Sequence, residues 1–597
     1  MFYFIRTVIL YLCFFVGISL GVQYAVGHHF LKAHEKKGAD VQPMSLSLAI
    51  RNIQTHQRIT KTGLFLSGMA AQHRRDWNGA WQNFSSLYER FENDSDTALK
   101  AFTLALNNGE YKRASQTAHS IRSNYLDKKE GQSKPESYDL VRLFHVLQAI
   151  KSNDSDAVKD GLKQLKGRTL AQFALPVIEA WTDPESLSDK SNNLEKTQLY
   201  FKALAAEFHQ KPDIASSIMK KIESSVVGFK QIELVVAFYM RQGDIDKATS
   251  FLKKAMVHSP RDNEVRDLLT LIKENPKDYK ADIFTSYPLN GVNAGIAMAF
   301  HDFARAMFVE RAVDSALIFS QMAAYLDSKT PSVYATIGDV FKYQNQDDRA
   351  LIAYNRVLQG DPRYEDVLTS QAEILVDRNE IDSAIRILKA AIKKDGDNAY
   401  LHYVLANIYK DDKNYDTAIS YYDAAESLGL HDGKLNKKLW PLYYSRAIAF
   451  DLTDRWDDAE KDLLVAMQKF PNSPIILNYL GYAYADKGIN LEKAKEMISQ
   501  AVMSAPNDGY IIDSMGWILY RTGDYWEAVK YLERAARLRP YHMVINDHLG
   551  DAYWKVGRKL EAQYMWQRAI DYYDEVDEEQ RRMINKTRHK IEHGLDL

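Results

Sequence analysis

The stretch GWILYRTGDYWEAVKYLERAARLRP, residues 516–540, carries the spacing that decides the fold. Small residues stand at Gly516, Ala528 and Ala535, and Pro540 closes the segment. A polar turn containing Gly523 separates two runs with helical spacing. Because two antiparallel helices approach closely only where side chains are small, the pattern predicts a helix pair, with the glycine on its first helix and the alanines on its second.

The same pattern recurs along the chain. A bulky residue follows the early small residue by three positions and is expected to fill the same helix face, as Tyr553 does after Gly550. Internal repeats of this length predict a stack of helix pairs rather than a single compact core. The early small residue returns every 34 or 35 residues, with one longer interval, at Ala304, Gly338, Ala372, Ala406, Ala447, Gly481, Gly516 and Gly550.

This combination of small, aromatic, alanine and proline positions resembles the tetratricopeptide repeat (TPR) family, whose unit is a 34-residue helix pair. The resemblance implies an all-α fold: a right-handed superhelical solenoid of antiparallel helix pairs with a concave binding face. Residues 291–573 are expected to form about eight repeats, and residues 574–597 a capping helix. Weaker versions of the pattern, such as Gly68 with Ala80 and Val236 with Ala248, predict divergent TPR-like helix pairs across residues 61–290.

The N-terminus carries an uncharged, mostly apolar run over residues 7–26. Its length suits a helix that crosses a bilayer, and it also suits the apolar region of a signal peptide. We therefore expect residues 1–27 to be a signal peptide or membrane anchor and residues 28–60 to be a linker and first helix. Basic residues flank the run on both sides, so they leave its orientation open.

Composition excludes several classes of function. Lys and Arg number 77 against 79 Asp and Glu, so the chain has no overall attraction to nucleic acid. The single cysteine, Cys13, excludes internal disulfides and cysteine-based zinc sites. The sequence contains no zinc-protease, Walker or dinucleotide-loop motif. We predict a non-enzymatic protein with no cofactor, no metal, no nucleic-acid partner and no small-molecule substrate.

Candidate binding residues lie on the first helix of each pair, at or next to positions −3, +1 and +4 from the small residue. In the TPR family this stripe lines the concave groove. Aromatic rings beside Asn, Asp and Arg suit an extended peptide, although the rings could instead stiffen the inner wall. His548 falls outside the stripe and is expected to be structural. The candidates are Tyr403, Asn407, Lys410, Tyr444, Asn478, Tyr482, Asp513, Trp517, Tyr520, Arg521, Asp547, Asp551 and Trp554.

The leading functional hypothesis is a scaffold or adaptor of the bacterial cell envelope that binds other proteins in this groove. The apolar N-terminus followed by degenerate and then sharp repeats resembles the TPR proteins of the alphaproteobacterial envelope. That resemblance implies envelope or membrane proteins as partners, and membrane contact through residues 7–26 if they are not cleaved. It also implies a Gram-negative bacterium, with the repeats in the periplasm, either free or anchored to the inner membrane. The alternatives are an inner-membrane regulatory adaptor facing the cytoplasm and, less favoured, a TPR-type transferase.

Overall fold

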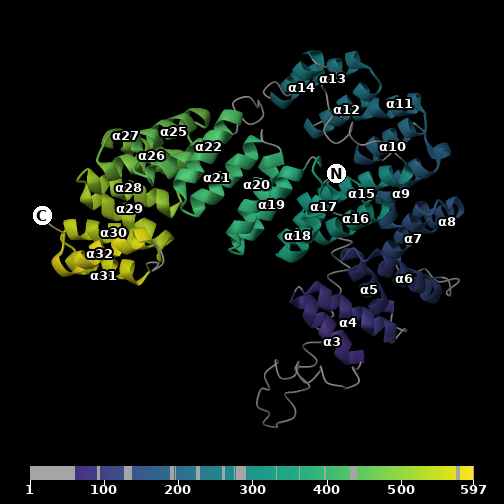
Figure 1. Ribbon diagram of the computed structural model, residues 1–597, viewed down its shortest axis with the longest axis horizontal. Coiled ribbons are helices and arrows are strands. Elements are labelled where there is room, and N and C mark those ends of the chain that lie inside the picture. The colour runs from purple at the N-terminus through teal and green to yellow at the C-terminus, as the bar shows by residue number, and fades with distance from the viewer. Residues whose placement is uncertain are drawn as a thin grey trace, which may run out of the picture. The chain divides into compact units, whose positions relative to one another are not determined.

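The computed structural model describes residues 61–595 except 75, 91–94, 127–137, 189–193, 195, 224–228, 259–262, 275, 277–290, 331, 362, 395–397, 430–439 and 573–577. Over these residues the chain is all-helical and forms two compact units, Met1–Val367 and Leu368–Leu597 (Figure 1). The border lies in the first turn of a helix, α19, within the range that the sequence predicts as one repeat array.

The second unit is a stack of antiparallel helix pairs. Each first helix packs on its own second helix, and successive pairs then pack on one another. The unit begins within α19 (Tyr364–Asp377), and α20 (Ile381–Lys394) packs on α21. The packed pairs are α21 (Ala399–Asp411) with α22 (Tyr415–Gly429), α24 (Trp440–Asp451) with α25 (Trp456–Lys469), α26 (Pro474–Lys487) with α27 (Leu491–Ser504), α28 (Gly509–Arg521) with α29 (Tyr525–Leu538), and α30 (Met543–Lys555) with α31 (Lys559–Asp571). A last helix, α32 (Glu578–His593), packs on α31.

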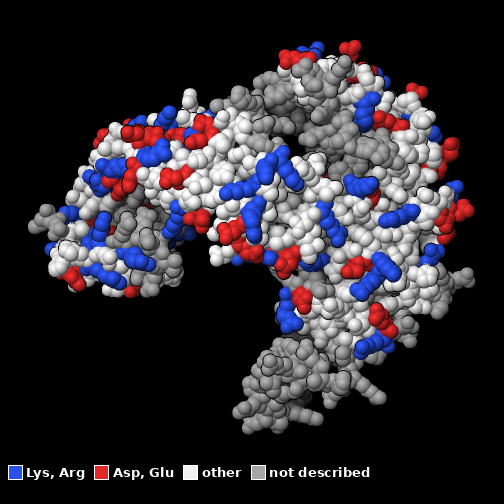
Figure 2. Space-filling view, in the orientation of Figure 1, with Lys and Arg blue, Asp and Glu red and all other residues white. Residues whose placement is uncertain are grey.

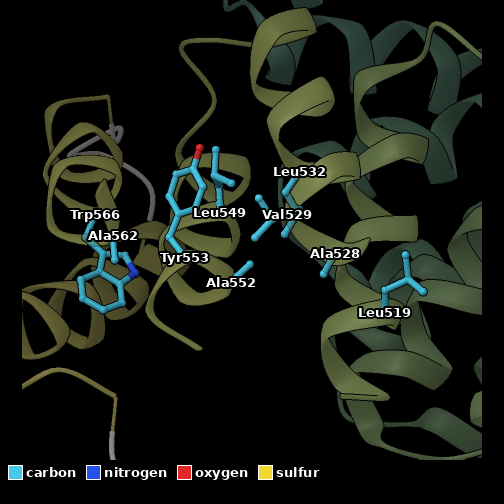
Figure 3. Packing of buried hydrophobic residues seen from close by; sticks show 9 residues of the cluster. All are labelled: Leu519, Ala528, Val529, Leu532, Leu549, Ala552, Tyr553, Ala562 and Trp566. Carbon is cyan, nitrogen blue, oxygen red and sulfur yellow. The ribbon is translucent and has the colours of Figure 1, made fainter. Parts of the chain in front are cut away.

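The repeated small residues set the distance between the two helices of a pair. A Cβ atom added at Gly550 would lie 2.4 Å from the indole of Trp566, and one at Gly516 would lie 2.5 Å from Leu532 Cγ. Figure 3 shows the resulting packing, in which residues of α28 and α29 meet those of α30 and α31 in one buried cluster. The prediction that these glycines let paired helices touch is confirmed.

The turns between paired helices follow a common backbone pattern. Seven residues after each small residue the chain adopts a positive φ, for instance 87° at Gly523 and 85° at Gly557. This left-handed residue ends the first helix and is usually glycine. Asn379, Lys413 and Asp454 hold the same place with φ of about 60° and therefore carry the strain of an L side chain there.

The first unit contains further helix pairs. Its helices are α3 (Lys61–His73), α4 (Trp77–Arg90), α5 (Ser95–Asn107), α6 (Tyr111–Ile121), a short π-helix η1 (Arg122–Leu126), α7 (Asp139–Lys151), α8 (Ser155–Leu165), α9 (Thr169–Thr182), a 3-10 turn η3 (Pro184–Ser186), α10 (Lys196–Phe208), α11 (Pro212–Glu223), α12 (Phe229–Arg241), α13 (Ile245–His258), α14 (Asn263–Glu274), α15 (Val292–Val309), α16 (Val313–Leu326), α17 (Val333–Tyr343) and α18 (Asp347–Tyr354). The early patterns do mark paired helices: Gly68 lies on α3 and Ala80 on α4, and Val236 and Ala248 lie on α12 and α13.

The pair α15–α16 forms a hub that the repeat pattern does not predict. Besides packing on each other, α15 contacts α9 and α10, and α16 contacts α5 and α7. Phe173 of α9 lies 4.1 Å from Phe303 of α15, ring centre to ring centre, and Tyr111 donates a 2.8 Å hydrogen bond to Gln321 of α16. A solenoid repeat would contact only its neighbours. For α15–α16, that expectation is wrong.

The expected signal peptide or anchor and the linker after it, residues 1–60, lie outside the described residues. Among the helices that the structure does describe, none is both long and apolar enough to span a bilayer. On the visible face of each unit, Lys and Arg side chains are interspersed with Asp and Glu (Figure 2), as the near-neutral net charge predicts.

Candidate functional site: the first-helix face of the second unit

Three aromatic rings form a stack on the first helices of the last two pairs. The indole of Trp517 lies between Tyr520, at 5.0 Å and 8°, and His548, at 4.0 Å and 13°. Tyr482 of α26 approaches the other side of His548, with ring centres 6.4 Å apart. The stack therefore joins α26, α28 and α30, which follow one another at repeat spacing, on one side of the unit.

His548 is a buried, ion-paired histidine. Its Nδ1 lies 3.0 and 3.1 Å from the two carboxylate oxygens of Asp513, and only 4% of the residue is exposed. Burial by itself lowers the pKa of His548, but Asp513, with Asp547 and Asp551 nearby, raises it above the ordinary value. The prediction that His548 is structural is confirmed.

Asp547 and Asp551 hold the C-terminal helix. Lys590 Nζ of α32 lies 2.6 Å from Asp547 and 2.8 Å from both oxygens of Asp551. Thr587 donates a 2.8 Å hydrogen bond to Asp547, and the indole nitrogen of Trp566 donates one of the same length to Asp551. Burial and the neighbouring carboxylate raise the pKa of Asp551 to about 6, against the opposing effect of Lys590.

These contacts correct part of the predicted groove. Asp513, Asp547 and Asp551 are 3–5% exposed and are bound by His548 or Lys590. The expectation that they point toward a partner is therefore wrong, because positions −3 and +1 of one first helix face the next helix along the stack. Trp554, at position +4, is half-buried and lies against Gly594, close to the end of α32.

The remaining candidates are half-buried side chains on consecutive first helices. The structure places them together by repeat: Tyr403, Asn407 and Lys410 on α21, Tyr444 on α24, Asn478 and Tyr482 on α26, and Trp517, Tyr520 and Arg521 on α28. We call these nine residues the first-helix face.

The first-helix face has an aromatic surface with its charges satisfied inside the chain. Tyr444 packs edge-on against Tyr479 at 5.7 Å. Lys410 lies 2.9 Å from a carboxylate oxygen of its neighbour Asp411, and Arg521 donates a 2.7 Å hydrogen bond to the backbone carbonyl of Asp486. Two buried polar atoms have no hydrogen-bond partner, the side-chain oxygen of Asn478 and the indole nitrogen of Trp517.

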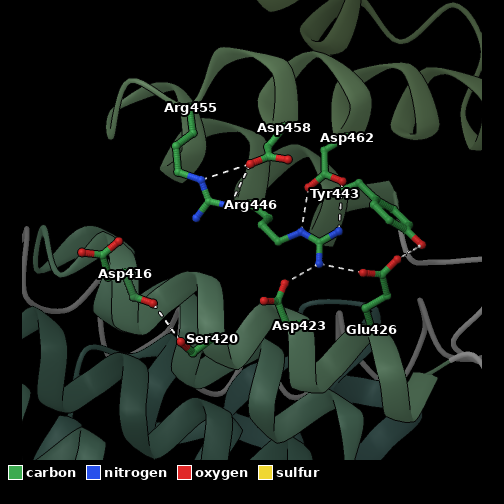
Figure 4. Close-up of polar contacts among 9 residues, drawn as sticks. All are labelled: Asp416, Ser420, Asp423, Glu426, Tyr443, Arg446, Arg455, Asp458 and Asp462. Carbon is green, nitrogen blue, oxygen red and sulfur yellow. Dashed lines mark hydrogen bonds and ion pairs between the residues drawn. The ribbon is translucent and has the colours of Figure 1, made fainter.

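Sequence reasoning missed a second buried network, centred on Arg446 of α24 (Figure 4). The guanidinium donates to both oxygens of Asp462 at 2.7 and 2.9 Å, to Asp423 at 2.7 Å and to Glu426 at 2.6 Å. Burial lowers the pKa of Arg446, but these carboxylates outweigh burial and raise it. The network ties α22, α24 and α25 together, and the only signal in the sequence is a charged residue next to the packing residue Ala447.

The chemistry available at these sites is limited. Asp513 and His548 have the hydrogen bond of a base and its orienting carboxylate, but His548 is enclosed and Trp517 covers one face of its ring. A general base needs reach to a substrate proton, and here no surface admits one. Within the described part of the chain, no cluster of three or more His, Cys, Asp or Glu residues is placed to hold a metal ion.

Comparisons with known proteins agree with this architecture. The tetratricopeptide repeat family matches residues 369–430, and a second match to the repeat covers residues 513–542. A TPR repeat-containing protein of Pseudomonas aeruginosa is 29% identical over 221 residues, or 37% of this chain and 36% of the relative. The match thus spans little more than a third of the relative's length.

Among solved structures, the anaphase-promoting complex assembly Cut9–Hcn1 is similar over 91% of this chain and 99% of that one, at 13% identity and a TM-score of 0.37. Yeast Tom70 is similar over 89% and 96%, at 13% identity and a TM-score of 0.30. Both similarities are too distant to transfer any property.

The chain therefore contains tetratricopeptide repeats, matched at residues 369–430 and 513–542, within a unit that stacks antiparallel helix pairs.

Proposed function

We propose that this chain is a non-enzymatic scaffold that binds partner proteins along the first-helix face. The observation that carries the proposal is the recurrence of half-buried tyrosine, tryptophan and asparagine side chains on four consecutive first helices. Aromatic rings held in place by a rigid scaffold offer large contact area at low entropic cost, which is typical of protein-binding surfaces.

The kind of partner follows from the polarity of the face. Its ring surfaces beside half-buried asparagine and basic side chains suit an extended segment, whose side chains would lie on the rings. Alternatively, the tyrosines only stiffen the inner wall of the stack, in which case no partner would lie against them.

Site-specific photocrosslinking in the native cells separates the two alternatives. A photoreactive phenylalanine analogue replaces Tyr403 or Tyr444 in the full chain, and in a matched control it replaces Leu464, which is 37% exposed on the second helix α25. Defined crosslinked species are expected from the two tyrosine positions and not from the control. Equal labelling from all three positions, or none from the tyrosines, would contradict partner binding at this face.

We further propose that the protein acts in the bacterial envelope, with the repeats on the periplasmic side. The support is the apolar run at residues 7–26, which lies outside the described residues. A reporter that is active in only one compartment, fused after Leu597, tests this location. Activity of a cytoplasmic reporter would favour the alternative, a regulatory adaptor on the cytoplasmic side of the inner membrane.

A further inference from the structure

A second surface lies away from the first-helix face, around the turn between α29 and α30. The turn runs from Leu538 to His542 and leaves Tyr541 71% exposed. Exposed tyrosines of α28, α31 and the residue after α31 surround it, together with exposed Arg539 of the turn and half-buried Arg568 of α31. We call this surface the turn-edge patch and define it by Tyr510, Arg539, Tyr541, Tyr564, Arg568 and Tyr572.

Direct contacts make the turn-edge patch continuous. On one side of the turn, the guanidinium of Arg539 lies 4.9 Å from the ring centre of Tyr510. On the other, the rings of Tyr541 and Tyr572 meet edge-on at 5.1 Å, and Arg568 lies 5.5 Å from the ring centre of Tyr572. Arg568 also donates a 2.7 Å hydrogen bond to the carbonyl of Pro540, between the two halves. The residues of the patch are therefore linked by contacts into one surface.

The cations of the patch are not neutralised by carboxylates of the described chain. The ion pairs of this region use Arg558 and Lys590, and none is formed by Arg537, Arg539 or Arg568 among the described residues. Two acids close in sequence to residues of the patch form contacts within the chain, since the Asp508 side chain caps α28 and the Asp571 side chain accepts a hydrogen bond from Gln567.

Two buried nitrogens beside the turn also lack hydrogen-bond partners. These are Nδ1 of His542 and Nε of Arg568. Burial lowers the pKa of His542, so its ring is neutral near pH 7 and Nδ1 is free to accept or donate. Buried polar atoms are normally satisfied, so these two nitrogens are unsatisfied polar atoms beneath the patch rather than contacts for a ligand.

We propose that the turn-edge patch is a docking surface for an acidic, extended segment of a partner protein. Arg539 is exposed, lies over the ring of Tyr510 and forms no ion pair among the described residues, so its N–H groups are available to the two oxygens of a carboxylate, whereas Arg568 holds the turn through Pro540. The exposed tyrosines supply apolar contact between those charges. This surface is separate from the first-helix face, and binding here does not require binding there.

A direct titration tests the proposal. The probe is a short fluorescent peptide of Asp, Glu and Leu, added to the full chain at low ionic strength and followed by anisotropy. The double variant Arg537→Glu/Arg539→Glu is expected to weaken binding at least about tenfold, since it reverses the exposed charge of Arg539 and that of Arg537, an exposed arginine just outside the patch. The matched control is Lys461→Glu, a charge reversal at an exposed position of α25.

Two further variants and a second ligand distinguish loss of binding from loss of folding. Tyr541→Ser removes an exposed ring without burying a charge and is expected to weaken binding about tenfold if the arginine variant does not fold. Tyr444→Ser, on the first-helix face, is expected to leave the affinity unchanged, which separates this proposal from the previous one. The proposal is overturned if the wild-type chain does not bind the peptide, or if the arginine and tyrosine variants both bind it as tightly as the wild type does. Tighter binding of a single-stranded DNA oligonucleotide of equal charge would assign the patch to nucleic acid and overturn it too.

Discussion

Replacing Gly550 by alanine tests whether the repeat spacing is set by helix contact. The new Cβ would lie 2.4 Å from two atoms of the Trp566 indole, where ordinary contact begins at 3.4 Å, so the ring must retreat by about 1 Å. It has little room to do so, because Trp566 is fully buried and its indole nitrogen is bound to Asp551 at 2.8 Å. A close-packed interior resists such a movement.

The magnitude follows from three opposing effects. Overpacking a core costs about 1–3 kcal/mol, and a weakened hydrogen bond to a carboxylate adds about 1.5 kcal/mol at the low end of its range. Alanine stabilises the helix by about 0.5–1 kcal/mol relative to glycine, because its helix propensity is higher. We therefore expect Gly550→Ala to destabilise the last pair, α30–α31, by about 1.5–4 kcal/mol, even though alanine is the better helix former.

Hydrogen exchange measured by mass spectrometry gives the local readout, because repeat stacks need not unfold in one step. Amides of residues 543–571 are expected to exchange about tenfold faster or more, while those of α21 and α22 do not change. The double variant Gly550→Ala/Trp566→Phe has a smaller ring opposite the new methyl group, so it should lose less stability than the two single effects added together. Unchanged or slower exchange in Gly550→Ala would refute the contact argument.

Three further predictions concern the second unit. Lys590→Met leaves Asp547 and Asp551 buried without their cation and should loosen α32 by about 3–5 kcal/mol, seen as fast exchange of residues 578–593; protected amides there would contradict it. Folding raises the pKa of His548, so its stabilising effect is complete below its unfolded pKa of about 6.5 and is lost as pH rises through the folded value. The stability advantage of the wild type over His548→Gln, measured by urea unfolding, should therefore shrink from about pH 6 to higher pH rather than grow. Lys413→Gly relieves a φ of 61° and should raise the free energy of unfolding by about 0.5–1 kcal/mol in the same assay, whereas a loss would show that the lysine side chain outweighs the strain.

The sequence predicts the paired helices and their contact residues because that information is local. Gly516, Gly550 and the alanines that follow them have to be small to let two helices touch, whatever surrounds the pair. Side-chain roles that depend on distant segments could not be predicted in this way. Asp547 and Asp551 occupy positions that line a groove in the family, and nothing in their spacing shows that Lys590, some 40 residues later, lies against them.

The hub formed by α15 and α16 in the first unit is indicated by the composition of one helix rather than by the repeat spacing. The helix VDSALIFSQMAAYL, residues 313–326, is apolar on all sides, and nearly all of its residues are buried. A helix without a polar face is expected to be covered from every direction, so α16 cannot have been an ordinary repeat helix with one side in solvent. Which helices cover it depends on contacts between residues more than 200 positions apart, such as Gln321 with Asn107, which periodicity does not encode.

The two proposed binding surfaces should differ in their response to salt, and this difference follows from where the chain uses its own charges. On the first-helix face, Lys410 is paired with Asp411 and Arg521 with a backbone carbonyl, and beneath it buried Asp513 is paired with His548. A partner there would meet rings and amides, so its affinity should change by less than about threefold between low and physiological salt.

At the turn-edge patch, exposed Arg539 and half-buried Arg568, which form no ion pair among the described residues, would supply much of the attraction. Screening at a Debye length of about 8 Å then weakens binding markedly, mostly through a slower association rate. Stopped-flow binding at two salt concentrations measures this directly, with the acidic peptide for the patch and a crosslinked partner segment for the first-helix face. Equal salt dependence at both surfaces would mean that the paired charges of the first-helix face open to meet a partner, and the buried ion pair of Asp513 and His548 would then be the first contact to examine.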